Sequence, residues 1–284
     1  MPEVRSPTLR RRELGALLRA RRLELGLTVD QVAERLMCSP SKVSRMETGQ
    51  RGTTLRDVRD LCQIYGLTDQ AKIDDLMNLA REGKQQGWWQ PFDLEFSTYV
   101  GLEAEAASTK YYHSTVVPGL LQTADYARAM HEAAPGISPE RIGELVKVRL
   151  TRQQLLTRDQ PLVISAVMDE AALHRVVGGA AVMKAQLKQL EELASFPHVT
   201  IRIISFEAGA HPAMDSTFRI LEFGGPVSNV VYIEGLVGYI YLDRAQDIAR
   251  YEKVFASLCE LALNPQESIE LIAKIGDKYK DAPI

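Results

Sequence analysis

The sequence has no long apolar run. Its longest stretch without Asp, Glu, Lys or Arg is 111–124, which has 14 residues and includes a histidine and a Pro-Gly pair. A membrane-spanning helix needs about 20 apolar residues, so we expect no transmembrane segment. Residues 10–12 are three arginines followed by a charged amphipathic pattern. Because a signal peptide carries a continuous apolar segment after its basic residues, we expect none here.

Cysteine is also scarce. Cys38, Cys62 and Cys259 are odd in number and far apart, and no CxxC pair occurs. This spacing excludes a disulfide framework and a cysteine zinc site, and it favours a reducing cytoplasm.

The motifs of common enzymes are missing too. The sequence has no G-x-S-x-G elbow, and Gly178-Gly179 is followed by neither Lys-Ser nor a third glycine. Asp169 and Glu170 with His174 are the strongest candidate for a metal or acid–base cluster, but they lack a second histidine at ligand spacing. We expect Asp169 to cap a helix that follows a strand, and we expect no catalytic residue, no metal and no cofactor.

What the sequence does contain is an uneven charge distribution. The 284 residues have a net charge of -3, yet 5–59 hold 13 Lys and Arg against 6 Asp and Glu. Residues 1–86 have a net charge of +4, and 87–284 have -7. The length predicts about two domains. We divide the chain into a basic domain, 1–86, that meets a polyanion, and an acidic domain, 87–284.

The basic domain is predicted to consist of short helices with sharp ends. Apolar residues recur at helical spacing, Thr28 and Ser39 are good N-caps, and Pro40 suits a first helical position. Gly26 and Gly49 are expected to end two of the helices. The predicted helices are 14–25, 29–36, 40–48 and 55–65, with a charged helix at 68–86 trailing behind them.

Two short helices joined by about four residues form a helix-turn-helix. The second, 40–48, buries Val43 and Met46 and carries hydroxyls and cations on its other face. Arginine reads guanine edges, serine pairs with either base type, and lysine binds phosphate or guanine. This helix therefore has the side chains of a helix that reads the major groove. The alternative, a module that contacts only proteins, would not explain the excess of basic residues in 5–59.

Residues 18–28 and 44–49 closely resemble the lambda-repressor-like family of the xenobiotic-response-element type, and the resemblance covers about 10–66. It implies that Arg22 pairs with Glu47 in a partly buried structural role. It also implies DNA contacts: Ser39 to phosphate, Ser41 and Arg45 to bases, with Lys42 and Ser44 beside them.

The chain departs from the family pattern at two positions. The family often has glutamine at the start of the second and third helices, where this sequence has Val29 and Pro40. Base reading by Pro40 is then limited to a thymine methyl group, and Gln31 is expected to serve a phosphate. Arg45 should supply most of the specificity, about 1–3 kcal/mol if it binds guanine with two hydrogen bonds. Arg51 completes the expected DNA-contacting set.

Relatives of this type generally bind as symmetric dimers. The resemblance therefore implies a homodimer on a near-palindromic operator, with half-sites one helical turn apart. Residues 10–12 form either a minor-groove arm or a solvated first helical turn. The dimer interface is expected in the acidic domain.

The acidic domain is predicted to contain both helices and strands. Gly-rich turns between its last strands predict a mostly antiparallel sheet. The expected fold is an all-α helix-turn-helix domain followed by an α+β domain large enough for its own core. Residues 111–118 are expected to be extended. The predicted strands are 161–168, 199–206, 217–223, 229–234 and 238–242, and the predicted helices are 93–110, 119–134, 138–157, 180–196, 246–263 and 265–278.

Segments 112–127, 168–175 and 231–234 look like one group of actinobacterial regulators, the WhiJ-like proteins, in which a helix-turn-helix precedes an uncharacterised C-terminal domain. The resemblance implies developmental or antitoxin-like control of transcription, often with a small protein encoded nearby. It supplies no ligand and no catalytic residue.

Four residues are candidates for a ligand or partner surface. Trp88 and Trp89 follow a flexible linker. They either bind a partner subunit or a ligand, or pack in the interface between the two domains. His211 and Asp215 lie in a Gly/Pro-rich loop between strands and would line a pocket there.

Together these features predict a cytoplasmic, nucleoid-associated, dimeric repressor that binds a double-stranded DNA operator. Its C-terminal domain is expected to receive a small-molecule or protein signal, with no membrane contact. Two alternatives remain open. One is an antitoxin-like protein that binds a small partner protein and regulates its own promoter, and the other is a DNA-tethered enzyme of unknown chemistry.

Overall fold

A computed structural model describes residues 6–85, 87–224 and 227–279. The chain divides into two compact units, Met1–Glu105 with Phe223–Ser228, and Ala106–Glu222 with Asn229–Ile284. The first unit therefore extends beyond residue 86, where the sequence places its boundary. No helix in the described part of the chain is long and apolar enough to cross a membrane.

The first unit is helical, and its caps follow the sequence. Thr28 and Ser39 accept hydrogen bonds from the backbone N–H groups of Gln31 and Lys42, and Thr54 does the same for Asp57. Side-chain acceptors at these positions satisfy the first N–H groups of each helix. The helices are α1 Pro7–Glu24, α2 Val29–Arg35, α3 Pro40–Glu47, α4 Leu55–Ile64, α5 Gln70–Glu82 and α6 Ser97–Glu103.

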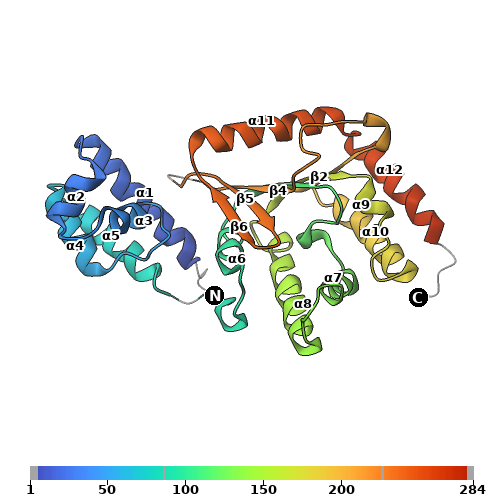
Figure 1. Cartoon of the computed structure of the whole chain (residues 1–284), viewed down its shortest axis with the longest axis horizontal. Helices are drawn as coiled ribbons and strands as arrows, with labels where there is room; N and C mark the ends of the chain where they lie inside the picture. The colour runs from blue at the N-terminus through green and yellow to red at the C-terminus, as the bar shows by residue number, and fades with distance from the viewer. Residues whose placement is uncertain (1–5, 86, 225–226, 280–284) are drawn as a thin grey trace. The chain divides into compact units, whose positions relative to one another are not determined.

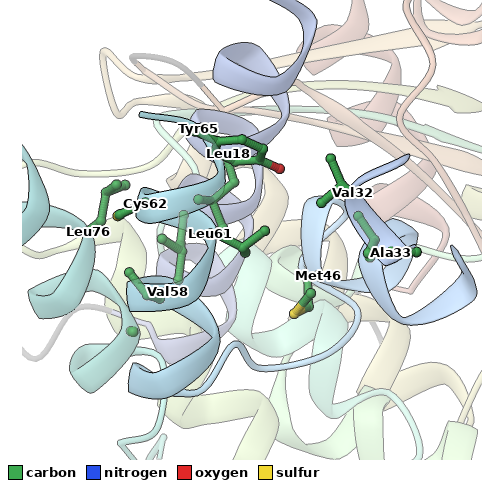
Figure 2. Close-up of a cluster of buried hydrophobic side chains, with 12 residues drawn as sticks. Leu18, Val32, Ala33, Met46, Val58, Leu61, Cys62, Tyr65 and Leu76 are labelled. Atoms are coloured by element: carbon green, nitrogen blue, oxygen red, sulfur yellow. The ribbon is translucent and has the colours of Figure 1, made fainter. Parts of the chain in front are cut away.

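An apolar core joins α1 to α5 (Figure 2). Each helix contributes one face, and the predicted inner residues Val43 and Met46 of α3 are each 1% exposed. Because α2 and α3 have only 7 and 8 residues, this burial rather than intrinsic helix propensity holds them in place. The core residues are Leu14, Leu18, Val32, Ala33, Val43, Met46, Val58, Leu61, Cys62, Tyr65, Leu76 and Ala80.

Helix α3 lies directly against α1 at Gly15. A Cβ atom at this position would lie 2.5 Å from the carbonyl oxygens of both Met46 and Glu47. Two backbones come this close only where one of them has no side chain, so Gly15 sets the distance between α1 and the end of α3.

The second unit is built on a mixed sheet of six strands in the order β3-β2-β1-β4-β5-β6. Strands β1, β2 and β3 are parallel, and the pairs β1–β4, β4–β5 and β5–β6 are antiparallel. The structure confirms the predicted fold class, with the parallel half joined by the helical crossovers that parallel strands require. The strands are β1 Ser108–His113, β2 Val163–Asp169, β3 Val199–Ile204, β4 Phe218–Glu222, β5 Val230–Gly235 and β6 Gly238–Leu242.

Helices lie on both faces of this sheet. Figure 1 shows α11 on one face and α7 and α8 on the other. The α11 face carries Tyr112, Phe218 and Val231, which pack with Phe255 and Leu258 of α11. The helices of this unit are α7 Ala124–Glu132, α8 Pro139–Gln153, α9 Ala171–His174, α10 Ala180–Ala194, α11 Ala245–Leu261 and α12 Pro265–Gly276.

One predicted helix, 93–110, is wrong. Helix α6 ends at Glu103, and Ser108–His113 form β1, a central strand that pairs with β2 on one side and β4 on the other. The extended segment was predicted to reach Pro118, but β1 ends at His113. Hydrogen bonds to strands that lie more than 50 residues away in the sequence decide this conformation. The local pattern of residues does not indicate these partners.

We expect Gly15→Ala to lower the free energy of unfolding of the first unit by about 2 kcal/mol, because the new methyl group forces α1 and α3 apart. The two tryptophans, Trp88 and Trp89, both lie in this unit, so urea unfolding followed by tryptophan fluorescence measures the loss. Gly143→Ala in α8 is the matched control, since a Cβ atom there meets nothing within 4 Å. It should leave the tryptophan transition unchanged, and an equal loss in both variants would contradict the close approach.

Candidate nucleic-acid interface

The turn between α2 and α3 is stabilised by backbone hydrogen bonds and by one residue in an unusual conformation. The N–H of Cys38 donates to the carbonyl of Ala33 at 2.9 Å, and Met37 has a φ of 51°. A left-handed residue of this kind reverses the chain within a short turn. Ser39 then caps α3, and Pro40 opens it.

Helix α3 presents one polar face. Ser39, Pro40, Ser41, Ser44 and Arg45 are all exposed, as a reader of the major groove must be. The Nε atom of Arg45 donates to the carbonyl of Ser41 at 3.3 Å, so its stem lies along the helix. The structure thus brings these five predicted residues onto one surface.

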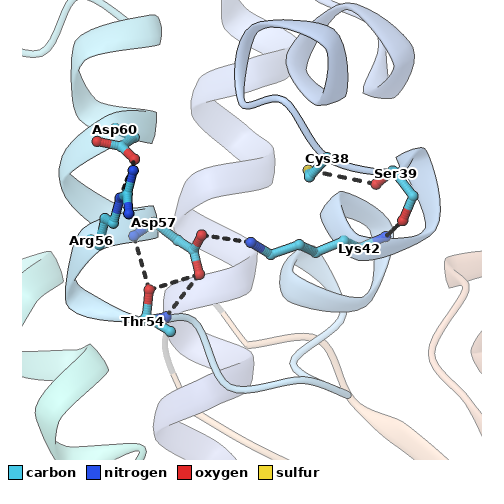
Figure 3. A network of polar contacts seen from close by, with 7 residues as sticks. All are labelled: Cys38, Ser39, Lys42, Thr54, Arg56, Asp57 and Asp60. Atoms are coloured by element: carbon cyan, nitrogen blue, oxygen red, sulfur yellow. Dashed lines mark hydrogen bonds and ion pairs between the residues drawn. The ribbon is translucent and has the colours of Figure 1, made fainter.

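Lys42 is placed differently from its neighbours on α3. Its Nζ atom lies 2.7 Å from Oδ1 of Asp57, at the start of α4 (Figure 3). Asp57 also accepts from the backbone N–H and the hydroxyl of Thr54. Burial alone raises the pKa of the Asp57 carboxyl, but the hydrogen bonds from Lys42 and Thr54 outweigh it and lower the pKa overall. Lys42 therefore ties α3 to α4.

Asp57 is a residue of this surface that was not among the predicted ones. The pattern in the sequence that could have pointed to Asp57 is a second capping box. In it, Thr54 and Asp57, three residues later, satisfy each other's backbone N–H groups. The spacing marks the start of α4, but only the fold shows that Lys42 reaches the same carboxylate.

Arg22 and Glu47 form a buried, two-bond ion pair between α1 and α3. Nε of Arg22 lies 2.6 Å from Oε1 of Glu47, and Nη2 lies 2.9 Å from Oε2. The remaining Nη1 donates to the carbonyl of Leu27 at 2.7 Å. The side chains are 9% and 6% exposed. The hydrogen bond to Glu47 is the main cause of a raised pKa at Arg22.

Gln31 and Arg51 lie beside this surface and are exposed. The Oε1 atom of Gln31 accepts from the N–H of Thr28 at 2.9 Å, completing a capping box at the start of α2. The N–H of Arg51 donates to the carbonyl of Arg45 at 3.0 Å, which places Arg51 next to the end of α3. Gln31 thus has a structural role in addition to the phosphate contact that is predicted for it.

The three arginines at 10–12 do not form an extended arm, because they lie within α1. Arg10 is 6% exposed and forms ion pairs with Glu13 and Glu82. Nε of Arg11 donates to the carbonyl of Pro7 at 3.2 Å, and burial lowers the pKa of this arginine. Both sequence interpretations, a minor-groove arm and a solvated turn, are therefore wrong for Arg10.

The four residues suggested for a ligand surface do not gather in one place within either unit. Trp88 and Trp89 belong to the first unit, with ring centroids 5.8 Å apart at 87°. Trp89 is 5% exposed and Trp88 39%, so Trp89 fills space while Trp88 reaches the surface. His211 and Asp215 belong to the second unit.

His211 is enclosed, and Asp215 is exposed. The His211 side chain is 3% exposed, and its Nε2 lies 3.2 Å from the hydroxyl of Tyr112 and 3.6 Å from Oδ2 of Asp169. Asp169 also accepts from the N–H of Ala171 at 2.8 Å, at the start of α9. The sequence predicts Asp169 as the cap of this helix, but Glu170 occupies the N-cap position, and Asp169 accepts its bond from one residue further back.

Comparison with known families matches both parts of the chain. A helix-turn-helix domain matches residues 13–76, and a domain of unknown function, DUF5753, matches residues 96–274. The chain belongs to the DUF5753 family. No curated protein and no solved structure matches it. The helix-turn-helix match, together with the exposed polar face of α3, makes this DUF5753 protein a DNA-binding transcription regulator.

We expect Glu47→Ala to lower the free energy of unfolding of the first unit by about 3–5 kcal/mol, because it leaves the Arg22 charge buried without its partner. Urea unfolding followed by tryptophan fluorescence measures this loss. Arg45→Ala, two residues away on the exposed face of α3, is the control and should change stability by no more than about 0.5 kcal/mol. Equal losses in the two variants would refute a structural role for the pair.

Proposed function

We propose that this protein is a sequence-specific repressor that binds a near-palindromic operator as a homodimer. The observation that carries the proposal is the exposed face of α3, whose orientation is set by the buried Arg22–Glu47 pair. The basic excess of 5–59 supports it, since phosphate contacts supply most of the affinity of such proteins.

In this proposal Arg45 reads a guanine edge with its guanidinium group. Ser41 and Ser44 flank it with hydroxyls that accept or donate to either base type. Ser39, Gln31 and Arg51 contact phosphates, and these contacts fix the register of the protein on the duplex. Pro40 offers only an apolar contact, for which a thymine methyl group is suited.

Dimerisation follows from the size of the module. Helix α3 has 8 residues, so one copy contacts only a few base pairs. Two copies related by a two-fold axis read half-sites one helical turn apart, which multiplies both affinity and specificity. We place the module in the xenobiotic-response-element type and the whole chain among the WhiJ-like actinobacterial regulators, because of the residues that resemble both groups.

The second unit receives the signal in this proposal and has no catalytic role. Among the described residues of this unit, the closest histidine–carboxylate pair is His174 with Glu170 at 3.0 Å, at the two ends of α9. His211 lies 3.6 Å from Asp169, and its side chain is 3% exposed. One observation favours the antitoxin-like alternative. Leu236 and Val237, at the tip of the β5–β6 hairpin, are 107% and 102% exposed, as expected for apolar residues that meet a partner protein.

The experiment that tests the main proposal is selection of genomic DNA fragments by the purified full-length protein, followed by titration of the best fragment against salt. Recovery of a near-palindromic site with two protein copies bound, and affinity that falls steeply as salt rises, is the expected result. Recovery of nothing above random DNA would contradict it.

We expect Arg45→Ala to remove about 1–3 kcal/mol of discrimination between the selected site and a site with the contacted guanine replaced. The fold should remain intact, because Arg45 is exposed. Lys72→Ala in α5 removes an equal charge away from α3 and should leave discrimination unchanged. Competition binding with both DNA sites measures the difference, and an Arg45→Ala variant that still prefers the original site would show that another residue reads it.

We also expect Asp57→Asn to strengthen binding. Asparagine keeps a side-chain oxygen that accepts from the N–H of Thr54, the residue that caps α4. It releases Lys42 to a phosphate, so the plot of log affinity against log salt should steepen by about 0.9. Asp75→Asn removes the same charge from α5 and serves as the control. If the two variants have the same salt dependence, releasing Lys42 from Asp57 adds no phosphate contact, and the prediction is wrong.

A further inference from the structure

A cavity of about 540 Å³ lies in the first unit, between α1 and the segment that runs from the end of α4 into α5. Leu17 and Leu67 form part of its apolar wall, and four further wall residues belong to the core drawn in Figure 2. These four are Leu18, Cys62, Tyr65 and Leu76. Ligand sites usually have volumes of about 300–1,000 Å³ and mostly apolar walls, so this cavity has the size of a small-molecule site.

The turn between α4 and α5 lines the cavity and is held by hydrogen bonds at both ends. The N–H of Leu67 donates to the carbonyl of Cys62 at 2.9 Å, and Gly66 has a φ of 60°. A left-handed glycine followed by such a bond is a common way to end a helix. Asp69 then caps α5 by accepting from two N–H groups of its first turn. Because both ends of the turn are fixed, the cavity keeps its shape without a ligand.

The apolar wall of the cavity is partly exposed to water. Leu17 is 37% exposed. Gly66 and Thr68 are exposed as well, and a Cβ atom at Gly66 would meet nothing within 4 Å. Removing apolar surface from water is favourable by about 25 cal/mol per Å². An apolar group that enters the cavity therefore gains free energy.

The charged side chains around the cavity favour a cation. Nη1 of Arg21 lies 2.9 Å from Oε2 of Glu24, so these two charges offset each other. Among the described residues, the other charged ones that line the cavity are Asp69, Lys72 and Asp75, which leave one negative charge in excess. Asp69 also caps the N-terminus of α5, so the positive end of that helix already has a carboxylate and does not attract an anion.

We propose that this cavity binds an organic cation that has an apolar body and an ammonium group. The body lies against Leu17 and Leu67, and the ammonium group pairs with the carboxylate of Asp75 at the rim. An exposed ion pair contributes only about 0.2–1 kcal/mol. The apolar contact therefore supplies most of the affinity, and the charge supplies the preference for a cation.

Helix α1 lies between this cavity and α3. Leu17, Arg21 and Glu24 recur at helical spacing on the side of α1 that lines the cavity. Gly15 and Arg22, which contact α3, lie on the opposite side of the same helix. The cavity residues include none of the expected DNA-contacting set, so the ligand leaves the DNA-binding face uncovered. This site goes beyond the proposed function, which places the signal in the second unit.

Methyl signals of the leucines in the full-length protein test the proposal. The probes share a naphthalene ring: naphthylethylamine is cationic at pH 7, naphthylethanol is neutral and naphthylacetate is anionic. Leu17 and Leu67 should shift along a saturable curve, with a dissociation constant about threefold lower for the amine than for the alcohol and highest for the acid. Leu150 and Leu261, exposed leucines of the second unit, are the reference signals. No saturable shift with the amine, or equal binding of the three probes, would overturn the proposal.

Two neighbouring carboxylates on α5 test the role of charge. Asp75→Asn should raise the dissociation constant of naphthylethylamine by about three- to fivefold and leave that of naphthylethanol unchanged. Asp74 does not line the cavity and accepts from Nε2 of Gln70 at 3.0 Å. Asp74→Asn removes the same charge and should change neither constant by more than about 1.5-fold. Equal responses to the two substitutions would contradict a pairing with Asp75.

Filling the cavity tests its position. Ala20 lines the cavity and is exposed, so Ala20→Phe should raise the dissociation constant of the amine by about tenfold or more without disturbing the core. Ala249→Phe adds the same side chain to an exposed position of α11 in the second unit and should leave binding unchanged. If Ala20→Phe binds the amine as the unchanged protein does, the cavity is not the site. Since these measurements contain no DNA, their failure leaves the DNA-binding proposal standing.

Discussion

The buried pair of Arg22 and Glu47 is the interaction on which the DNA-binding face depends. An isolated helix of 8 residues is not stable in water, so α3 takes its conformation and its direction from what it packs against. Two parallel hydrogen bonds fix the angle between Arg22 and Glu47 as well as their distance. Gly15 lets the two backbones approach closely enough for these bonds to form.

The same architecture reduces the charge that is available to DNA. Arg10 and Arg22 are buried in ion pairs, and Lys42 is tied to Asp57. Part of the basic excess therefore holds the module together instead of facing a polyanion. The exposed cations at the end of α3 are Arg45 and Arg51. The net charge of this unit therefore overstates the number of cations that are free to contact phosphates.

Local signals explain why the first unit was predictable. The caps Thr28 and Ser39, the proline at the start of α3 and the apolar spacing all act within a few residues, and each has its expected place in the structure. What failed depended on distant partners. Ser108–His113 became a strand because β2 and β4 lie on either side of it, and Arg10 became buried because Glu82 reaches it from α5.

His113 and His131 of the second unit show the same limit. They lie on β1 and α7, and the strands that pair with β1 begin more than 50 residues away in the sequence. A search for motifs finds nothing there, and His113 and His131 look like isolated histidines. Only the strand register and the missing hydrogen bonds distinguish them from histidines that are satisfied in a core. Buried groups without a hydrogen-bond partner are therefore recognised from the fold and not from the local sequence.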